Sequence, residues 1–191
     1  NSPEERTQII MNSNVTARRG GVRNAALAVA AAATLIASLL APAPAARADD
    51  PLPTGLTQET AAGSCWEIKQ KTPAAASGIY WIVTPQLVAP EQFYCDQETD
   101  GGGWVLIGRG REGWKEGYNG LRSPADVRNA PVGTPAFAPA QLPSKTVDAL
   151  LGGGRVDALA DGIRVRRATN QAGTTWQEAR LGIQARDRWK L

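Results

Sequence analysis

The chain contains only two cysteines, Cys65 and Cys95, and no histidine among its 191 residues. In an oxidising compartment an even pair of cysteines predicts a disulfide, and two buried free thiols are the alternative. The bond would close a loop of about 30 residues and stabilise the fold by roughly 3–4 kcal/mol on the loop-entropy model. Without histidine, these residues cannot build a Ser-His-Asp or Cys-His catalytic arrangement, or a zinc site of His and Cys ligands.

Residues 11–48 have the three parts of an export signal. Met11 is the only methionine, so we interpret residues 1–10 as upstream read-through; the alternative is a fragment that starts further upstream. Arginines without any acid precede the uncharged run 25–40, and the small-x-small pattern at 46–48 predicts cleavage. The shortness of the run favours a cleaved signal over an uncleaved anchor. We therefore expect a secreted, extracellular protein with no stable membrane span after cleavage.

The net charge of +3 belongs to this predicted signal. Residues 1–48 carry five of the 21 basic side chains and two of the 18 acidic ones, which leaves 16 of each sign in residues 49–191. A neutral mature chain gives no reason to expect a nucleic-acid partner. Residues 49–191 are enough for one domain with its own core.

The pattern of the mature chain predicts an α+β fold. Residues 49–63 are interpreted as a flexible leader, and residues 64–191 as one domain that is truncated at its C-terminus. We expect a disulfide-tied hairpin region, then a mixed, mainly antiparallel sheet with one or two short helices. The predicted strands are 79–84, 92–96, 104–108 and 163–168, the predicted helices are 64–71 and 142–151 (with Ser144 as a possible N-cap), and 109–140 is a long surface loop. In the last strand, apolar and basic residues alternate, which predicts one solvated face.

One stretch resembles a known family. Residues 93–109, FYCDQETDGGGWVLIGR, carry Tyr94, Asp96, the turn Gly101-Gly102-Gly103 and Trp104, and this pattern is similar to the hallmark of fibrinogen C-terminal domains. Upstream, SCWEI at 64–68 and SGIYWI at 77–82 resemble the opening of the same family, and the two cysteines fit its first disulfide. The Ala- and Arg-rich composition suggests a divergent bacterial member.

The resemblance implies an extracellular binding module without enzyme activity. Vertebrate members of the family carry a calcium site, a ligand pocket and a second disulfide in the C-terminal third. This chain has no second cysteine pair and no Asp-x-Asp cluster. Calcium is therefore implied by the resemblance alone, with no site residue identified, and no other cofactor is expected.

Three tryptophans in polar, loop-like contexts are candidates for ligand contact, because an indole ring can stack on a sugar. They are Trp114, Trp176 and Trp189, and partial burial under loops is the alternative. The expected function is a secreted or cell-surface recognition or adhesion module, and its expected partner is a cell-surface glycan or a protein.

Two alternative functions remain open. A carboxylate-dependent hydrolase needs no histidine, and its candidate acids are Glu98, Asp100, Glu112 and Glu116. The other alternative is a structural cap or stalk of a longer surface protein.

Two further clusters of charged residues can be interpreted either as functional or as purely structural. The alternating acids Asp96, Glu98 and Asp100 can offer oxygens to a cation, although an ordinary turn is the plainer reading. The basic stripe Arg164, Arg166 and Arg167 can touch acidic polymers, or can form the solvated face of a sheet.

Overall fold

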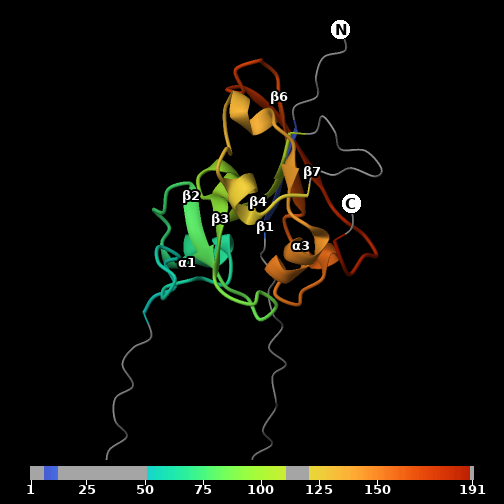
Figure 1. Cartoon of the computed structure of the whole chain (residues 1–191). Helices are drawn as coiled ribbons and strands as arrows, with labels where there is room; N and C mark the ends of the chain where they lie inside the picture. The colour runs from blue at the N-terminus through green and yellow to red at the C-terminus, as the bar shows by residue number, and fades with distance from the viewer. Residues whose placement is uncertain (1–6, 13–50, 111–120, 190–191) are drawn as a thin grey trace, which may run out of the picture. The chain divides into compact units, whose positions relative to one another are not determined.

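The computed structural model describes residues 7–12, 51–110 and 121–189, and the only side chain it describes in residues 7–12 is that of Met11. The helices and strands are labelled in Figure 1. They are β1 (Thr7–Asn12), α1 (Cys65–Lys71), β2 (Gly78–Ile82), β3 (Glu91–Asp96), η1 (Thr99–Gly101), β4 (Trp104–Arg109), α2 (Pro124–Arg128), η2 (Thr134–Phe137), β5 (Ala140–Gln141), α3 (Ser144–Leu150), η3 (Val156–Ala158), β6 (Ile163–Ala168) and β7 (Trp176–Leu181).

Within the described residues, seven strands form one sheet. Its order is β2-β3-β4-β1-β6-β7, and the short β5 also pairs with β4. Every pair of named strands is antiparallel. The predicted α+β class with a mainly antiparallel sheet is confirmed.

The disulfide is present and ties the first helix to the hairpin. Cys65 begins α1 and Cys95 lies in β3, with their Cα atoms 5.5 Å apart. The Ser64 side chain caps the helix by accepting a hydrogen bond from the backbone N–H of Glu67 at 3.0 Å. Gly78 of β2 pairs with Cys95 across the hairpin. The predicted helix, hairpin and disulfide are therefore confirmed, with small shifts of their bounds.

The glycine turn after β3 closes over a buried amide. The Gln97 side chain is fully buried; its Nε2 donates to the carbonyl of Cys65 at 3.0 Å, and its Oε1 accepts from Gly103 N at 3.1 Å. Gly102 has a φ of +75°, and a Cβ there would lie 2.2 Å from the carbonyl oxygen of Gln97. Gly101 has a similar φ of +82°, but a Cβ at Gly101 would meet nothing within 4 Å.

We expect Gly102→Ala to destabilise the domain by at least about 2 kcal/mol, because the left-handed backbone and the contact with Gln97 both oppose a side chain. Gly101→Ala is the control, since Gly101 also has a positive φ but a Cβ there meets no atom within 4 Å. Urea unfolding of the two variants measures the difference. Equal midpoints would show that the turn relaxes around the new methyl group.

The segment predicted as a long loop holds more structure than expected. Between residues 121 and 141 it contains α2, η2 and β5, and a Ser123–Asp126 capping box starts α2. The buried Arg109 at the end of β4 donates to the carbonyls of Asp126 at 2.7 Å and Pro135 at 3.1 Å. One buried cation thus holds α2 and η2 against the sheet, an arrangement with no periodic signature in the sequence.

The predicted leader is also partly packed. Gly55 accepts a hydrogen bond from Trp81 N at 2.7 Å, and Ala62 is fully buried and forms a parallel bridge to Ile82. Residues 55–62 therefore lie along β2, at variance with the prediction of a flexible leader in this part of 49–63.

The later prediction of a helix and a strand is confirmed as α3 and β6, but two details differ. Pro143, not Ser144, is the N-cap of α3. The prediction of a solvated basic face on β6 is wrong. Arg164 is fully buried and Arg166 is half-buried, so of the three stripe residues only Arg167 is exposed. Strand β7, which pairs with β6, was not predicted.

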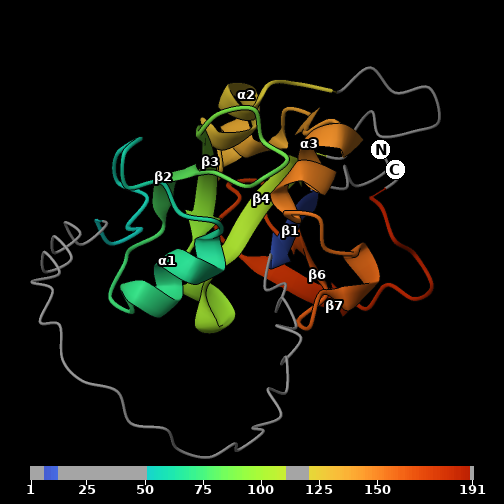
Figure 2. The same cartoon turned by 90° about the horizontal axis from the view of Figure 1, so that it is seen from below.

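Strand β1 was not expected either, because residues 1–10 were interpreted as upstream read-through and residues 11–48 as an export signal, and β1 takes residues from both. Its backbone pairs with β4 on one side and β6 on the other, and the Met11 side chain is fully buried. Figure 2 shows this strand in blue between the other two. None of the helices in the described ranges combines the length and the apolar character needed to cross a bilayer.

Candidate functional site

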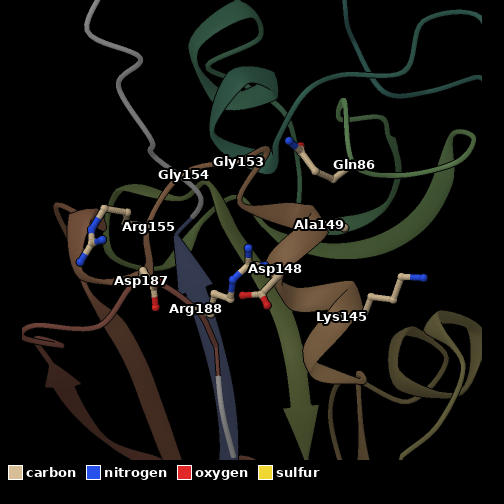
Figure 3. Close-up of a pocket in the computed structure, with 9 residues that line it drawn as sticks. All are labelled: Gln86, Lys145, Asp148, Ala149, Gly153, Gly154, Arg155, Asp187 and Arg188. Atoms are coloured by element: carbon tan, nitrogen blue, oxygen red, sulfur yellow. The ribbon is translucent and has the colours of Figure 1, made fainter.

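A pocket of about 770 Å³ opens beside α3 (Figure 3). Helix α3, the glycine turn that follows it, the C-terminal segment and the loop after β2 all contribute to its wall. The lining residues are Gln86, Lys145, Asp148, Ala149, Gly153, Gly154, Arg155, Asp187 and Arg188.

Local folding explains how these segments meet. The turn after α3 needs glycine, since Gly152 and Gly153 have φ values of +60° and +89°. The turn leads to η3, whose Val156 and Asp157 backbone N–H groups donate to the carbonyls of Asp187 and Arg186 at 3.2 and 3.1 Å. The C-terminal segment is thereby held beside the turn, and the two segments form one wall.

A carboxylate holds the same segment to α3. The side chain of Asp148 accepts from Trp189 N at 2.7 Å. Another lining residue, Arg155, donates to both oxygens of Asp157 at 2.8 and 2.7 Å. This bidentate bond lowers the pKa of Asp157 and raises the pKa of Arg155. This wall of the pocket is therefore held by side-chain hydrogen bonds as well as by backbone hydrogen bonds.

The pocket offers groups of both signs to a ligand. Lys145, Arg155 and Arg188 are cationic donors, and Asp148 and Asp187 are acceptors. In Figure 3, Arg188 and Asp148 project into the same part of the pocket, and Gln86 lies on the opposite side. This set can hydrogen-bond hydroxyl, amide or charged groups. The side chain of Asp148 is already engaged by Trp189 N, so the groups that remain available to a ligand are mostly cationic donors.

Two residues of the fibrinogen-like motif, Asp96 and Trp104, lie away from this pocket lining, around a buried ion pair. Asp96, at the end of β3, accepts from Arg164 of β6, and the Asp96 carboxylate also accepts from Thr99 N at 2.9 Å. The Arg164 guanidinium lies over the fully buried Trp104 ring at 4.7 Å, and Arg180 of β7 lies 5.2 Å from the centre of the same ring. We call Asp96, Trp104, Arg164 and Arg180 the Arg–Trp cluster. It fastens the hairpin to β6 and β7.

Hydrogen bonding sets the protonation state of this cluster. Burial by itself raises the pKa of Asp96, but the hydrogen bond from Thr99 and the bond and charge of Arg164 outweigh burial, so the pKa lies below its ordinary value. Asp96 is therefore ionised at neutral pH.

Acid should weaken the domain through Asp96. A carboxyl whose pKa is lower in the folded than in the unfolded state adds stability above the unfolded value of about 3.9, and this stability is lost as pH falls through the folded value. We expect the urea midpoint to fall as pH is lowered from 6 to 3. Other acids with lowered pKa, such as Asp157, add to this slope. In Asp96→Asn the urea midpoint should change less steeply with pH than in the wild type. Equal slopes would show that Asp96 does not contribute to the acid sensitivity.

The three candidate tryptophans are not brought together. Trp114 lies outside the described residues. Trp176 begins β7, half-buried, with Arg166 5.1 Å from its ring centre. Trp189 is only 7% exposed, so its ring packs in the core while its backbone N–H supports the pocket. Ligand contact through these residues stays a prediction, and the placements of Trp176 and Trp189 favour packing.

The candidate acids point to separate partners. Asp96 faces Arg164, Asp100 pairs with Arg180, and Glu98 accepts from Ser77 N at 3.2 Å. Across the described residues, no three His, Cys, Asp or Glu side chains converge on a metal-sized site. Two of the alternating acids are thus ion-paired, and the third accepts a backbone hydrogen bond. Glu112 and Glu116 lie outside the described residues.

Sequence reasoning missed both the pocket residues and the partners of Asp96. Lys145, Asp148 and Arg188 come from segments about 40 residues apart, and nothing in their local pattern joins them. For Arg164 the sequence held no such signal either: only the structure shows that Ile163 and Arg164, adjacent in β6, are both buried, and a buried arginine requires an acidic partner.

Comparison with known proteins agrees with the motif. Residues 62–121 match the family model of the C-terminal globular domain of fibrinogen beta and gamma chains. Bovine angiopoietin-4 is 41% identical over 68 residues, which are 32% of this chain and 14% of that protein. Mouse tenascin-N is 40% identical over 60 residues, which are 31% of this chain and 4% of that protein. No solved structure matches the chain significantly. The chain thus spans a small fraction of the length of these relatives.

Proposed function

From the premise that the chain contains a fibrinogen-like domain, we propose that it is an extracellular recognition module, not an enzyme, and that it binds a protein or glycan ligand in the pocket beside α3. The observation that carries the proposal is the open pocket of mixed charge on a wall that is held by backbone and side-chain bonds. Pre-ordered polar groups favour binding because little conformational entropy is lost when the ligand arrives.

Export supports the same proposal. The disulfide between Cys65 and Cys95 requires an oxidising compartment to form and persist. The matched relatives are an angiopoietin and a tenascin. A module of this kind needs a ligand site but no catalytic group, which agrees with the donors and acceptors of the pocket.

Exchanging two pocket cations tests the site. We expect the double variant Lys145→Ala, Arg188→Ala to bind its ligand at least about tenfold more weakly, since hydrogen bonds from charged donors contribute roughly 1.5–3 kcal/mol each. The matched control is Lys71→Ala, Arg167→Ala, which removes the same charge from exposed residues outside the pocket. A glycan array and a pull-down from cell-envelope protein identify the ligand, and surface plasmon resonance then compares the variants.

Each result decides between the functions. Equal losses in both double variants would mean that net charge, not the pocket, governs binding. If neither screen finds a ligand, the result contradicts the recognition function and favours the structural cap or stalk. Turnover of a polysaccharide that disappears in Asp148→Asn would instead favour a carboxylate-dependent hydrolase.

A further inference from the structure

Strand β7 ends the sheet on the side away from β2, and within the described residues no other strand pairs with its outer edge. The opposite end strand, β2, is partly covered, since Trp81 N donates to the carbonyl of Gly55 at 2.7 Å and Ala62 bridges Ile82. In β7, by contrast, residues 177–181 are all exposed. An exposed, extended edge of this kind is a template on which another strand can pair.

The hydrogen bonds to β6 determine which backbone groups of β7 face outward. Thr169 N donates to the carbonyl of Thr175 at 2.8 Å, so this pair, which continues the β6–β7 register, is a hydrogen-bonded pair. Hydrogen-bonded and non-hydrogen-bonded pairs alternate along an antiparallel ladder. The N–H and C=O groups of Trp176, Glu178 and Arg180 therefore point away from β6, and those of the residues between them point toward it.

The charges of the outward-facing residues complement a second copy of the same strand. When two β7 strands pair antiparallel, outward-facing groups must oppose one another, so the strands can slide only in steps of two residues. One alignment sets Glu178 opposite Arg180 of the second copy, and by symmetry it does so twice. Sliding by two residues in either direction sets Glu178 against Glu178 or Arg180 against Arg180. Opposite charges on facing residues stabilise a strand pair and like charges destabilise it, so the first alignment is favoured.

The same alignment also covers apolar surface on the other face of the strand. It sets Ala179 opposite Ala179 of the second copy, and Gln177 opposite Leu181. The Leu181 side chain is 49% exposed in the single chain. Pairing therefore removes apolar surface from water on this face while it brings unlike charges together on the other.

We propose that β7 is a self-pairing edge, through which two copies of the chain associate as antiparallel strands with Glu178 of each copy opposite Arg180 of the other. Charged side chains on an edge repel most strands, so they restrict pairing to a partner that complements them. The strand itself is such a partner. An interface made of one strand pair is small, and small interfaces are weak, so we expect a dimer that forms as the concentration rises.

Sedimentation equilibrium of the full chain, over concentrations up to its solubility limit, measures the association. We expect a monomer–dimer equilibrium. Hydrogen exchange, followed by NMR at low and high concentration, then locates the contact. In the dimer the amides of Glu178 and Arg180 should exchange several-fold more slowly, because they gain acceptors. The amides of Gln177 and Ala179 already face β6 and should change little.

Charge reversal tests the alignment. Glu178→Arg and Arg180→Glu each set like charges opposite one another, so we expect either variant alone to lose the dimer. Each reversal also disturbs a partner in its own chain, Arg166 or Asp100. An equimolar mixture of the two variants should nevertheless associate, since every arginine of one then faces a glutamate of the other. Arg167→Glu, an exposed change on β6 away from this edge, is the control and should dimerise like the wild type.

Three results would overturn the proposal. The wild type stays monomeric at every concentration, or a dimer forms without slower exchange at Glu178 and Arg180, or the mixed variants fail to associate. Damage within a single chain is not repaired by mixing, so the last result separates misfolding from a lost contact. None of the β7 residues lines the pocket, and the outcome is therefore independent of the proposed function.

Discussion

Replacing Arg164 with methionine is expected to lower the free energy of unfolding by about 3–5 kcal/mol, because the buried Asp96 carboxylate then keeps only the more distant Arg166, 3.9 Å away, as a cationic neighbour. Arg164 is fully buried, and the Asp96 side chain is only 6% exposed, so solvent cannot replace the lost bond. The stacking of Arg164 on Trp104 is lost as well. Urea denaturation followed by tryptophan fluorescence measures the change.

The same strand supplies the control. Arg167→Met removes an equal charge from an exposed position in β6, and we expect a change within about 0.5 kcal/mol. The double variant Arg164→Met, Asp96→Asn should recover part of the loss, since no unpaired charge remains. If the double variant is as unstable as Arg164→Met, the loss comes from packing around Trp104 and not from the buried carboxylate.

Removing the disulfide is expected to lower the free energy of unfolding by about 3–4 kcal/mol, since the bond closes a loop with a sequence separation of 30. Replacing Cys65 and Cys95 together with alanine leaves no free thiol, so the effect belongs to the cross-link and two small side chains. Both residues are fully buried, and the bond is the covalent link between α1 and β3. Differential scanning calorimetry of the variant and the wild type measures the shift in Tm.

Reduction of the wild type gives an independent measurement. Wild type that is unfolded, reduced and refolded with reductant should match the double variant. If both retain the wild-type Tm, then the hydrogen bonds of Gln97 and the packing of α1 are sufficient to hold this region, and the cross-link adds nothing measurable.

The part of the fold that was predictable rests on short-range patterns. Hairpin β2–β3, strand β4 and the turn at Gly102 and Gly103 are close in sequence, and their residue types match the local backbone they adopt. The pairing of Cys65 with Cys95 follows from there being only two cysteines. The motif that resembles the fibrinogen C-terminal family lies in this same region, which is why the sequence revealed it.

The pocket and the Arg–Trp cluster were not predictable in this way. The alternation in β6 predicted a solvated basic face. The periodicity of one strand cannot show that Arg164 pairs with an aspartate 68 residues away in the sequence. The pocket likewise depends on α3, the following turn and residues 187–188 meeting in space. A sequence pattern indicates which face of a single helix or strand is buried. A site depends on how close several such elements lie to one another in space.

By itself, then, the sequence determined the local elements: where the chain turns, where it extends, which cysteines can bond, and which catalytic chemistries lack their residues. The tertiary structure alone decided which charges are buried, which segments form the pocket, and that residues 7–12 lie between β4 and β6. The physical reason is that turns and strands follow from neighbours along the chain, while ion pairing, pocket formation and strand order are set by contacts between residues distant in sequence, whose free energy depends on the whole packed sheet.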